Sequence, residues 1–411
     1  MVSSGSGYCT IVQNNATGSA VTNEARCVQW TSTNPATQNC NITQTNVHGT
    51  NRAFVVQVVT QSQPDGEQTA TQNATVHQSN LAGANESAVT QTIGQHESKF
   101  VGGATAATQT QEGHQYIEVC QGAAVNPCFA PSSGTNKSGV NQNHVQLASV
   151  QFDDGAAGAI SQNQNATTGP KSSSYVRQNT SDKTNEAALL QFSRQTGTVH
   201  NRRTDDEDDG PSARVGFNGT VFQQQGHNVS CSADGLCGFQ FQTSTGVQRA
   251  FERQDEVQRL VAPPGAAQTQ FGPEFCCATQ TGGNNGSVNK ISQSKAQFHT
   301  SSLTEGTIQG HCDSPSPDLN NCDVTQTLTQ NGTTTSNACS GASCNTVISC
   351  TQGGEGSRLC TPYAGDGTPT PVCPGGPCPV PPCVEGCVIT FVPMRVPSFL
   401  AVLPDESSLT G

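Results

Sequence analysis

The chain has 411 residues, of which 32% are hydrophobic, 12% are charged and about two fifths are Ser, Thr, Asn or Gln. An ordinary globular chain carries roughly 25% charged residues, so we do not expect a conventional enzyme built from Leu-rich helices. The formal net charge of −12 argues against nucleic acid and anionic membranes as partners, because both attract basic surfaces. Disorder also fits poorly, since charge is low and Thr and Val are abundant.

Cysteine usage predicts the compartment. The 19 cysteines indicate an oxidising environment, where disulfides persist. The first residues lack the basic segment and apolar core of a signal peptide, so we expect a processed, secreted or cell-surface chain. No transmembrane helix is expected, because Pro393, Arg395 and Pro397 interrupt the most apolar stretch, 387–403.

An alternating motif recurs along the chain, with the fullest form Asn-x-Ala-x-Val-x-Gln-x-Val-x-Gln at Asn51. Related copies begin at Asn85, Asn185 and Asn320, and weaker ones begin at positions 23, 115, 156, 218, 248 and 287. A period of two is typical of one face of a β-strand. A second strand that ends in Gln precedes several copies, so each unit predicts strand, turn, strand and turn. One such unit cannot bury its own face, whereas stacked units can.

Stacking of these units would align equivalent side chains about 4.8 Å apart. A buried amide can then donate to one neighbour and accept from the other, which satisfies it away from water. The residues expected in amide ladders are Asn23, Asn51, Asn85, Asn185, Asn218, Asn320, Gln57, Gln91, Gln121, Gln162, Gln191, Gln224 and Gln326. The residues expected in one apolar column are Val55, Val89, Val119, Ile160, Leu189, Phe222 and Val324.

Three segments depart from the pattern. The unit at Gln248 fits least well, because Glu252 and Glu256 would point inward. Residues 122–141 and 261–283 contain Pro and Cys and are expected to be loop insertions within a repeat domain that spans 1–340.

The Asn-x-Ala-x3-Gln half of the unit resembles the repeat of curli, the extracellular amyloid fibre subunits of bacteria. Asn23/Ala25/Gln29, Asn51/Ala53/Gln57 and Asn185/Ala187/Gln191 carry this resemblance, which covers roughly residues 8–335. It implies a β-solenoid and a secreted subunit that stacks end to end into fibres of a biofilm or cell surface. Stacking also follows from physics, because a solenoid ends in unpaired strand edges that template another chain.

An acidic run occupies residues 204–210, with Asp205, Glu207 and Asp209 in alternation. We expect a solvated turn there. The alternative is a calcium loop, but Gly216 stands where such a loop carries its bidentate Glu.

Residues 341–411 form a Cys- and Pro-rich tail with an apolar final segment. Disulfide staples are expected to stabilise it, because a short Pro-rich segment cannot build a core; zinc is the alternative, although the cysteine spacings differ from those of zinc sites. The segment 388–403 could cap its own solenoid or add as a strand to a neighbouring subunit, and we favour the neighbour. The residues expected at that subunit contact are Val388, Ile389, Phe391, Val396, Phe399 and Leu400.

Nothing in the sequence predicts catalysis, a cofactor or a resident metal, since no phosphate-binding, metalloprotease or nucleophile motif is present. The fold expected is therefore all-β, a β-solenoid of about ten strand–turn–strand rungs with the stapled tail. The function expected is a structural filament subunit that pairs with itself, with cell-surface or matrix components as further partners. The alternatives are a monomeric adhesin or an ice-binding solenoid, which needs regular Thr on one flat face, and a solenoid polysaccharide lyase or hydrolase, for which charged residues are too few.

Overall fold

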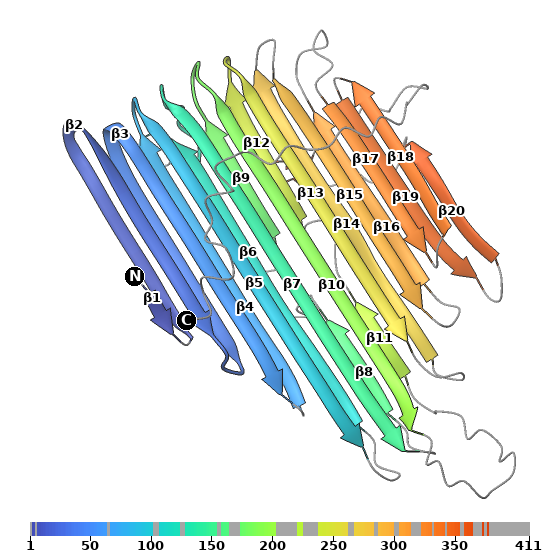
Figure 1. The fold of residues 1–411 in the computed structure, drawn as a ribbon. Coiled ribbons are helices and arrows are strands. Elements are labelled where there is room, and N and C mark those ends of the chain that lie inside the picture. The colour runs from blue at the N-terminus through green and yellow to red at the C-terminus, as the bar shows by residue number, and fades with distance from the viewer. Residues whose placement is uncertain are drawn as a thin grey trace, which may run out of the picture.

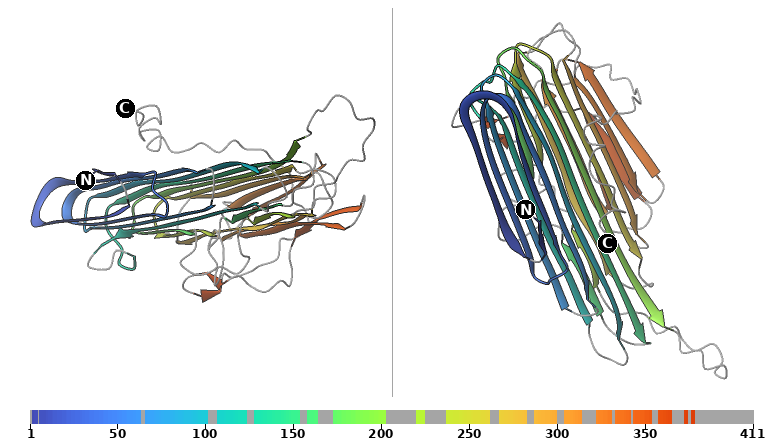
Figure 2. Two further views of the ribbon diagram at one scale, coloured as in Figure 1. Left: turned by 90° about the horizontal axis from the view of Figure 1, so that it is seen from below. Right: turned by 60° about the vertical axis from the view of Figure 1, so that its left-hand side comes forward.

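The computed structural model describes residues 2–4, 6–63, 66–101, 107–123, 128–153, 158–163, 173–202, 220–224, 237–261, 267–282, 287–299, 304–313, 322–330, 333–341, 343–353, 357–364, 372–373 and 376–377. The described residues are nearly all in β-strands and contain no helix (Figure 1). The all-β class predicted from the sequence is therefore correct. A long, mostly parallel sheet dominates the molecule, and Figure 2 shows that it is folded into two facing layers.

The first layer, which we call the Asn layer, contains the strands that begin at the repeat asparagines. All of its pairings are parallel up to β17, and β18 then pairs antiparallel with β17. In order of pairing, it consists of β1 (Val2–Ser4), the second half of β2 (Gly7–Thr31), the second half of β3 (Ala36–Gln63), β5 (Ala84–Val101), β7 (Thr135–Asp153), β10 (Asn185–Arg202), β13 (Gln248–Val261), β15 (Val288–His299), β17 (Cys322–Gln330) and β18 (Thr333–Gly341).

The second layer, which we call the facing layer, holds the other strand of each unit. Two of its positions are filled by pairs of short strands that lie end to end along one neighbour, β8 with β9 and β11 with β12. It consists of the first halves of β2 and β3, β4 (Gly66–Asn80), β6 (Ala107–Gly122), β8 (Gly158–Asn163), β9 (Ser173–Asn179), β11 (Thr220–Gln224), β12 (Cys237–Ser244), β14 (Ala267–Gly282), β16 (Thr304–Asp313), β19 (Ser343–Gly353) and β20 (Ser357–Ala364). A separate antiparallel pair joins β21 (Val372–Cys373) to β22 (Gly376–Pro377).

The turns between the layers also stack on one another. The backbone N–H of Leu81 donates to the carbonyl of Asn46 at 3.2 Å, and that of Ser133 donates to the carbonyl of Leu81 at 2.9 Å. Glycine is required here, because a β-carbon on Gly49, which has φ 102°, or on Gly83 would overlap the backbone of the preceding turn. Hydrogen bonding therefore continues around the turn from one unit to the next.

Two segments expected to be loops contain long strands instead. Residues 267–282 form β14, and β7 begins at Thr135, inside the interval 122–141. The backbone register explains the correction, because β7 fills the place between β5 and β10 and β14 fills the place between β11 or β12 and β16.

Candidate functional site: amide ladders and the outer edge of β2

A continuous ladder of glutamines runs along the Asn layer. Each Nε2 donates to the Oε1 of the preceding strand's glutamine, at 2.7–3.1 Å throughout. The ladder contains, in order, Gln29, Gln57, Gln91, Gln142, Gln191, Gln254, Gln293 and Gln326. Because every bond donates in the same direction, the ladder has a polarity, with its donor side toward β2.

The facing layer carries a matching ladder with the same direction. It runs through Gln13, Gln44, Gln78, Gln121, Gln178, Gln242 and Gln280 at 2.7–3.0 Å. The second amide hydrogen of Gln78 donates to the carbonyl of Glu86 at 2.8 Å, and that of Gln121 donates to Lys137 at 2.8 Å. These acceptors belong to strands of the Asn layer, so each glutamine joins its neighbours along the stack and also ties the two layers together.

An asparagine ladder lies beside the turns and runs in the opposite direction. Asn23 donates to Asn51 at 3.0 Å, Asn51 to Asn85 at 3.0 Å and Asn85 to Asn136 at 2.9 Å, and Asn136 donates to Asn185 at 3.0 Å. Asn51 and Asn136 also donate to turn carbonyls, those of Ser79 and Asn179. The repeat asparagine therefore holds both its neighbour and the turn.

The register divides the predicted apolar column between the two layers. Val55, Val89, Leu189 and Val324 share one row of the Asn layer, together with Cys27, Val140, Glu252 and Ile291. Val119 belongs instead to a row of the facing layer with Ile42, Val76 and Val176. From Cys27 to Leu189 the Asn-layer row packs with the facing row in one core cluster, whereas Ile291 and Val324 belong to a second cluster. The single column is thus corrected to two rows that face each other.

Other predicted ladder residues also lie in the facing layer. Gln121 occupies its glutamine ladder, and Ile160 and Gln162 lie on β8, paired with Gln109 and Gln111. Phe222 and Gln224 lie on β11 opposite Ser161 and Asn163, which places them one residue out of register with Ile160 and Gln162. These units copy the alternation of the motif but not its position in the stack.

Some expectations fall outside the described residues. They concern Asn218 and Asn320, the acidic run 204–210, and the subunit contact at Val388, Ile389, Phe391, Val396, Phe399 and Leu400.

One unit of the Asn layer was not predicted from the sequence. Strand β7 carries Asn136, Val140, Gln142 and Gln146, in register with Asn85, Val89, Gln91 and Gln95. The signal was present, because 136–146 reads Asn-x-Ser-x-Val-x-Gln-x-His-x-Gln. It was obscured by spacing, since ladder neighbours lie between 28 and 63 residues apart.

Charged residues do face the core, as the sequence predicted for Glu252 and Glu256, which are both buried. Lys295 on the next strand is also fully buried, and its Nζ lies 2.5 Å from Glu256 Oε2. His144 is a further inward-facing titratable group. Burial lowers its pKa to about 3, with a smaller contribution from His114, so the ring is neutral at ordinary pH. Gly113 leaves room for this ring, because a β-carbon there would overlap it.

Among the described strands, none pairs with the outer edge of β2 over residues 7–15. In the described part of the chain these residues pair only with 38–46 of β3, while β1 covers the outer side of Val28–Trp30. Gln13 accepts from Gln44 and donates to the Glu24 carbonyl at 2.8 Å, and its other amide hydrogen meets no acceptor among the described residues. Tyr8, Val12 and Trp30, all on β2, expose 80%, 70% and 51% of their surface.

The opposite end of the stack is built differently. Strand β18 folds back on β17, β19 pairs antiparallel with β16, and β20 pairs antiparallel with β19. At this end Gln326 of the ladder stands opposite Asn337 rather than another glutamine. The parallel register therefore ends here, and its two ends differ.

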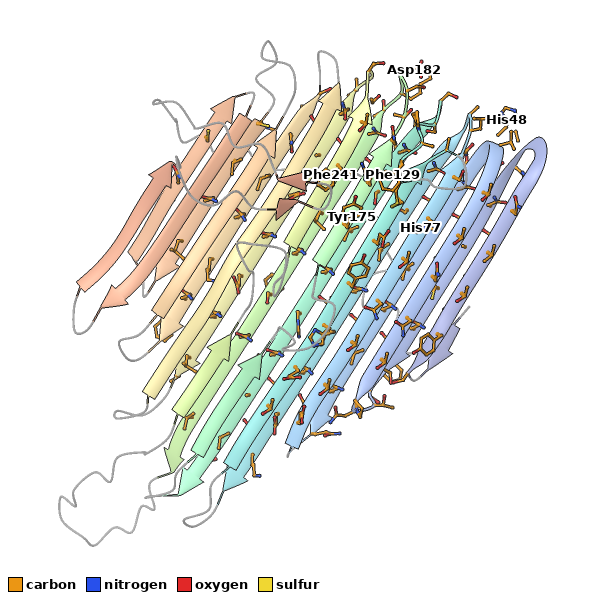
Figure 3. All side chains as sticks on the ribbon, turned by 180° about the vertical axis from the view of Figure 1, so that it is seen from behind. His48, His77, Phe129, Tyr175, Asp182 and Phe241 are labelled. Atoms are coloured by element: carbon orange, nitrogen blue, oxygen red, sulfur yellow. A yellow bond between two sulfur atoms is a disulfide. The ribbon has the colours of Figure 1, made fainter. Side chains whose placement is uncertain are left out.

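The outer face of the facing layer carries a group of polar and aromatic side chains (Figure 3). Glu118 accepts from Tyr116 at 2.8 Å and lies 3.1 Å from His77 Nε2. The bond to His77 holds the pKa of Glu118 below its usual range against the opposing effect of burial. Nearby, the Tyr175 and Phe241 ring centroids are 5.6 Å apart.

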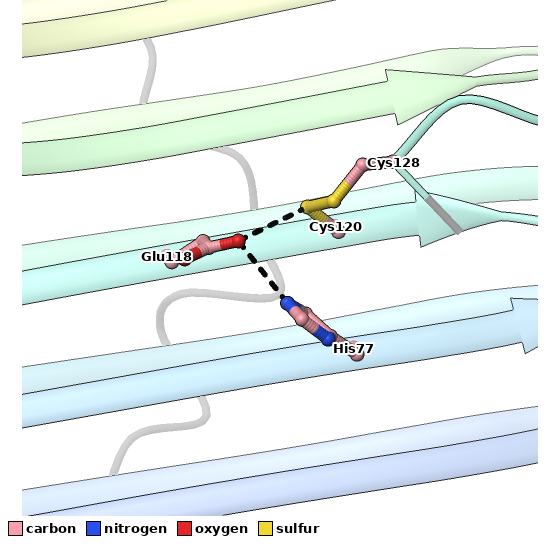
Figure 4. Close-up of side chains that lie close together, drawn as sticks. All are labelled: His77, Glu118, Cys120 and Cys128. Atoms are coloured by element: carbon pink, nitrogen blue, oxygen red, sulfur yellow. Dashed lines mark hydrogen bonds and ion pairs between the residues drawn. A yellow bond between two sulfur atoms is a disulfide. The ribbon is translucent and has the colours of Figure 1, made fainter. Parts of the chain in front are cut away.

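His77 and Glu118 also lie beside Cys120 and Cys128, and the four ligand atoms are all within 4.8 Å of one another (Figure 4). The two cysteines are joined by a disulfide, so neither sulfur is available as a thiolate ligand. What remains is one half-exposed His–Glu pair, which is too few ligands for a transition-metal site.

No family model, curated protein or solved structure matches the chain. Within the described residues, no helix has the length and apolarity needed to span a membrane.

Proposed function

We propose that this protein is a structural subunit of an extracellular filament, in which β-solenoids stack end to end. In this account the two layers are the faces of a solenoid of about ten rungs. The observation that carries the proposal is the pair of unbroken glutamine ladders, of which the facing-layer one ends at Gln13 on β2, where residues 7–15 have no outer neighbour among the described strands. An open edge of this kind pairs readily with another strand.

Hydrogen-bond polarity supports a head-to-tail arrangement. All the ladder bonds between glutamines donate toward β2, so a donor is left at Gln13. A further rung continues the ladder only if it offers acceptors to that donor, which favours contact between unlike ends. Interfaces between unlike surfaces build open filaments when the rotation does not close a ring. The antiparallel strands β18 and β20 would supply the other edge.

Exposed apolar side chains support an interface at the same end. Tyr8, Val12, Val21 and Trp30 all lie on β2 and are all exposed. A second copy placed over this strand would remove their apolar surface from water, which is worth roughly 25 cal/mol per Å². The Cys120–Cys128 disulfide fits an extracellular setting, since disulfides are rare in reducing compartments.

A monomeric surface adhesin is the second candidate, because the antiparallel strands at one end could terminate the stack. An ice-binding face has less support. In the facing layer one outward row contains Val12, Thr43, His77, Cys120 and Arg177, so Thr does not repeat along it.

Two adjacent substitutions on β2 test the filament. Gln13→Lys places an ammonium group where the ladder would continue, whereas Asn14→Lys adds the same charge on the exposed outer face of the same strand. We expect Gln13→Lys to raise the protein concentration needed for assembly at least tenfold and Asn14→Lys to leave it unchanged, measured by sedimentation and electron microscopy of the full chain. Equal assembly by the two variants would contradict stacking through this edge.

A further inference from the structure

Three buried cysteines converge at the β2 end of the core. Cys9 on β2 and Cys40 on β3 are neighbours in the facing layer, and Cys27 comes from the Asn layer. Their three sulfur atoms all lie within 4.8 Å of one another. None is in a disulfide, and their exposed fractions are 1%, 3% and 0%.

The cluster interrupts rows that are otherwise filled by simple apolar residues. In the next strands Ala74 follows Cys40, and Val55 follows Cys27. Packing at these positions is thus satisfied by Ala and Val. Packing alone therefore does not explain why three cysteines lie together between the two layers.

We propose that Cys9, Cys27 and Cys40 form a binding site for one soft, thiophilic metal ion, and that the preferred ion is Cu(I). Thiolates select soft ions such as Cu(I) and Zn(II). An ion equidistant from three sulfurs at about 2.3 Å, the usual metal–thiolate length, needs the sulfurs about 4.0 Å apart, which the observed cluster accommodates.

The surroundings favour copper over zinc. Structural zinc sites are almost always four-coordinate, and among the described residues this cluster offers three ligands in an apolar shell of Ala25, Ile42 and Val55. Cu(I) accepts three sulfur ligands without a fourth. Metal binding displaces thiol protons, so affinity rises with pH.

The site is independent of the filament proposal, since binding needs only the first two units of one chain. Cys9 lies on β2, the strand at this end of the stack.

The test is a titration of the full chain with Cu(I), without oxygen, in competition with a coloured Cu(I) chelator. Cys40→Ala and Cys27→Val copy the residues of the next unit and so preserve packing, and Cys9→Ala is a third variant at the edge. We expect each variant to bind one Cu(I) fewer than the unmodified chain. The paired change Cys120→Ala and Cys128→Ala is the matched control, expected to lose none.

Equal Cu(I) uptake by the unmodified chain and a folded cluster variant would overturn the proposal. Peptide mapping that finds two of the three cysteines joined by a disulfide in the isolated protein would overturn it as well. Should any one variant fail to fold, as judged by circular dichroism, the other two still give the stoichiometry.

Discussion

The first strands of the Asn layer and the later ones share one register but fill it differently. From β3 to β10 the central row holds Val55, Val89, Val140 and Leu189, whereas β13 places Glu252 in the same row. The glutamine ladder continues through both regions without a gap. The difference indicates that the backbone pairing and the amide ladder define the stack, and that the residues between them can vary. The same strand also places Glu256 in the core, where Lys295 compensates its charge.

The largest expected effect concerns the buried ion pair of the later region. Lys295→Leu leaves the Glu256 carboxylate in the core without the ammonium 2.5 Å away. Removing one partner of a buried pair costs about 3–5 kcal/mol, so we expect a loss of this size in guanidinium unfolding. The double variant Lys295→Leu with Glu256→Ser, which copies Leu328 and Ser193 of the neighbouring strands, should recover most of it. If the double variant does not recover stability, the loss in Lys295→Leu does not come from the uncompensated Glu256 carboxylate.

A slightly smaller effect is expected within the regular ladder. Gln91→Leu removes a donor to Gln57 and to the Tyr116 carbonyl, and the acceptor of Gln142. Unsatisfied buried groups cost about 1–3 kcal/mol each, and we expect a total loss of about 3 kcal/mol after local relaxation. Gln151→Leu on the exposed face is the control and should change stability little. A similar result for both variants would argue against the ladder as the stabilising element.

His144 gives the early region a pH dependence. Its ring is held neutral in the fold, with a pKa of about 3 against 6.5 ordinarily, so below pH 6.5 the unfolded chain binds a proton that the folded chain does not. Stability is therefore full above pH 6.5 and falls as the pH drops toward 3, by at most about 1.4 kcal/mol per pH unit. His144→Ile, which copies Ile93 of the preceding strand, should weaken this dependence in unfolding measured at pH 7 and 5. The exposed His48→Asn should not.

The smallest effect is expected on the surface. Arg52 and Glu86 form an ion pair at 2.9 Å between adjacent strands, with both side chains more than a third exposed. Such pairs contribute about 0–1 kcal/mol, so Arg52→Ala should shift the unfolding midpoint only slightly, and less in high salt. A larger loss would mean that surface pairs, and not the interior amides, hold the register.

The all-β class and much of the register of the Asn layer could be predicted from the sequence. Both the period-two alternation and the Asn-to-Gln spacing lie within one strand, so they are visible without knowledge of the stack. Gln57, Gln91 and Gln191 therefore fall on one ladder. Layer membership is a property of the stack, and Val119 and Gln121 show the same local pattern in the other layer. Asn136 was missed because insertions change the distance between units but not the pairing. The Cys9, Cys27 and Cys40 cluster could not be foreseen, since two layers must fold together to form it.

The filament itself is tested most directly by negative-stain electron microscopy of the native, non-reduced chain over a concentration series, with fibre diffraction of the same sample. The account predicts long, uniform filaments that increase with concentration and give a reflection near 4.8 Å along the filament axis. Discrete rods whose length does not change with concentration would contradict end-to-end stacking and favour the monomeric adhesin.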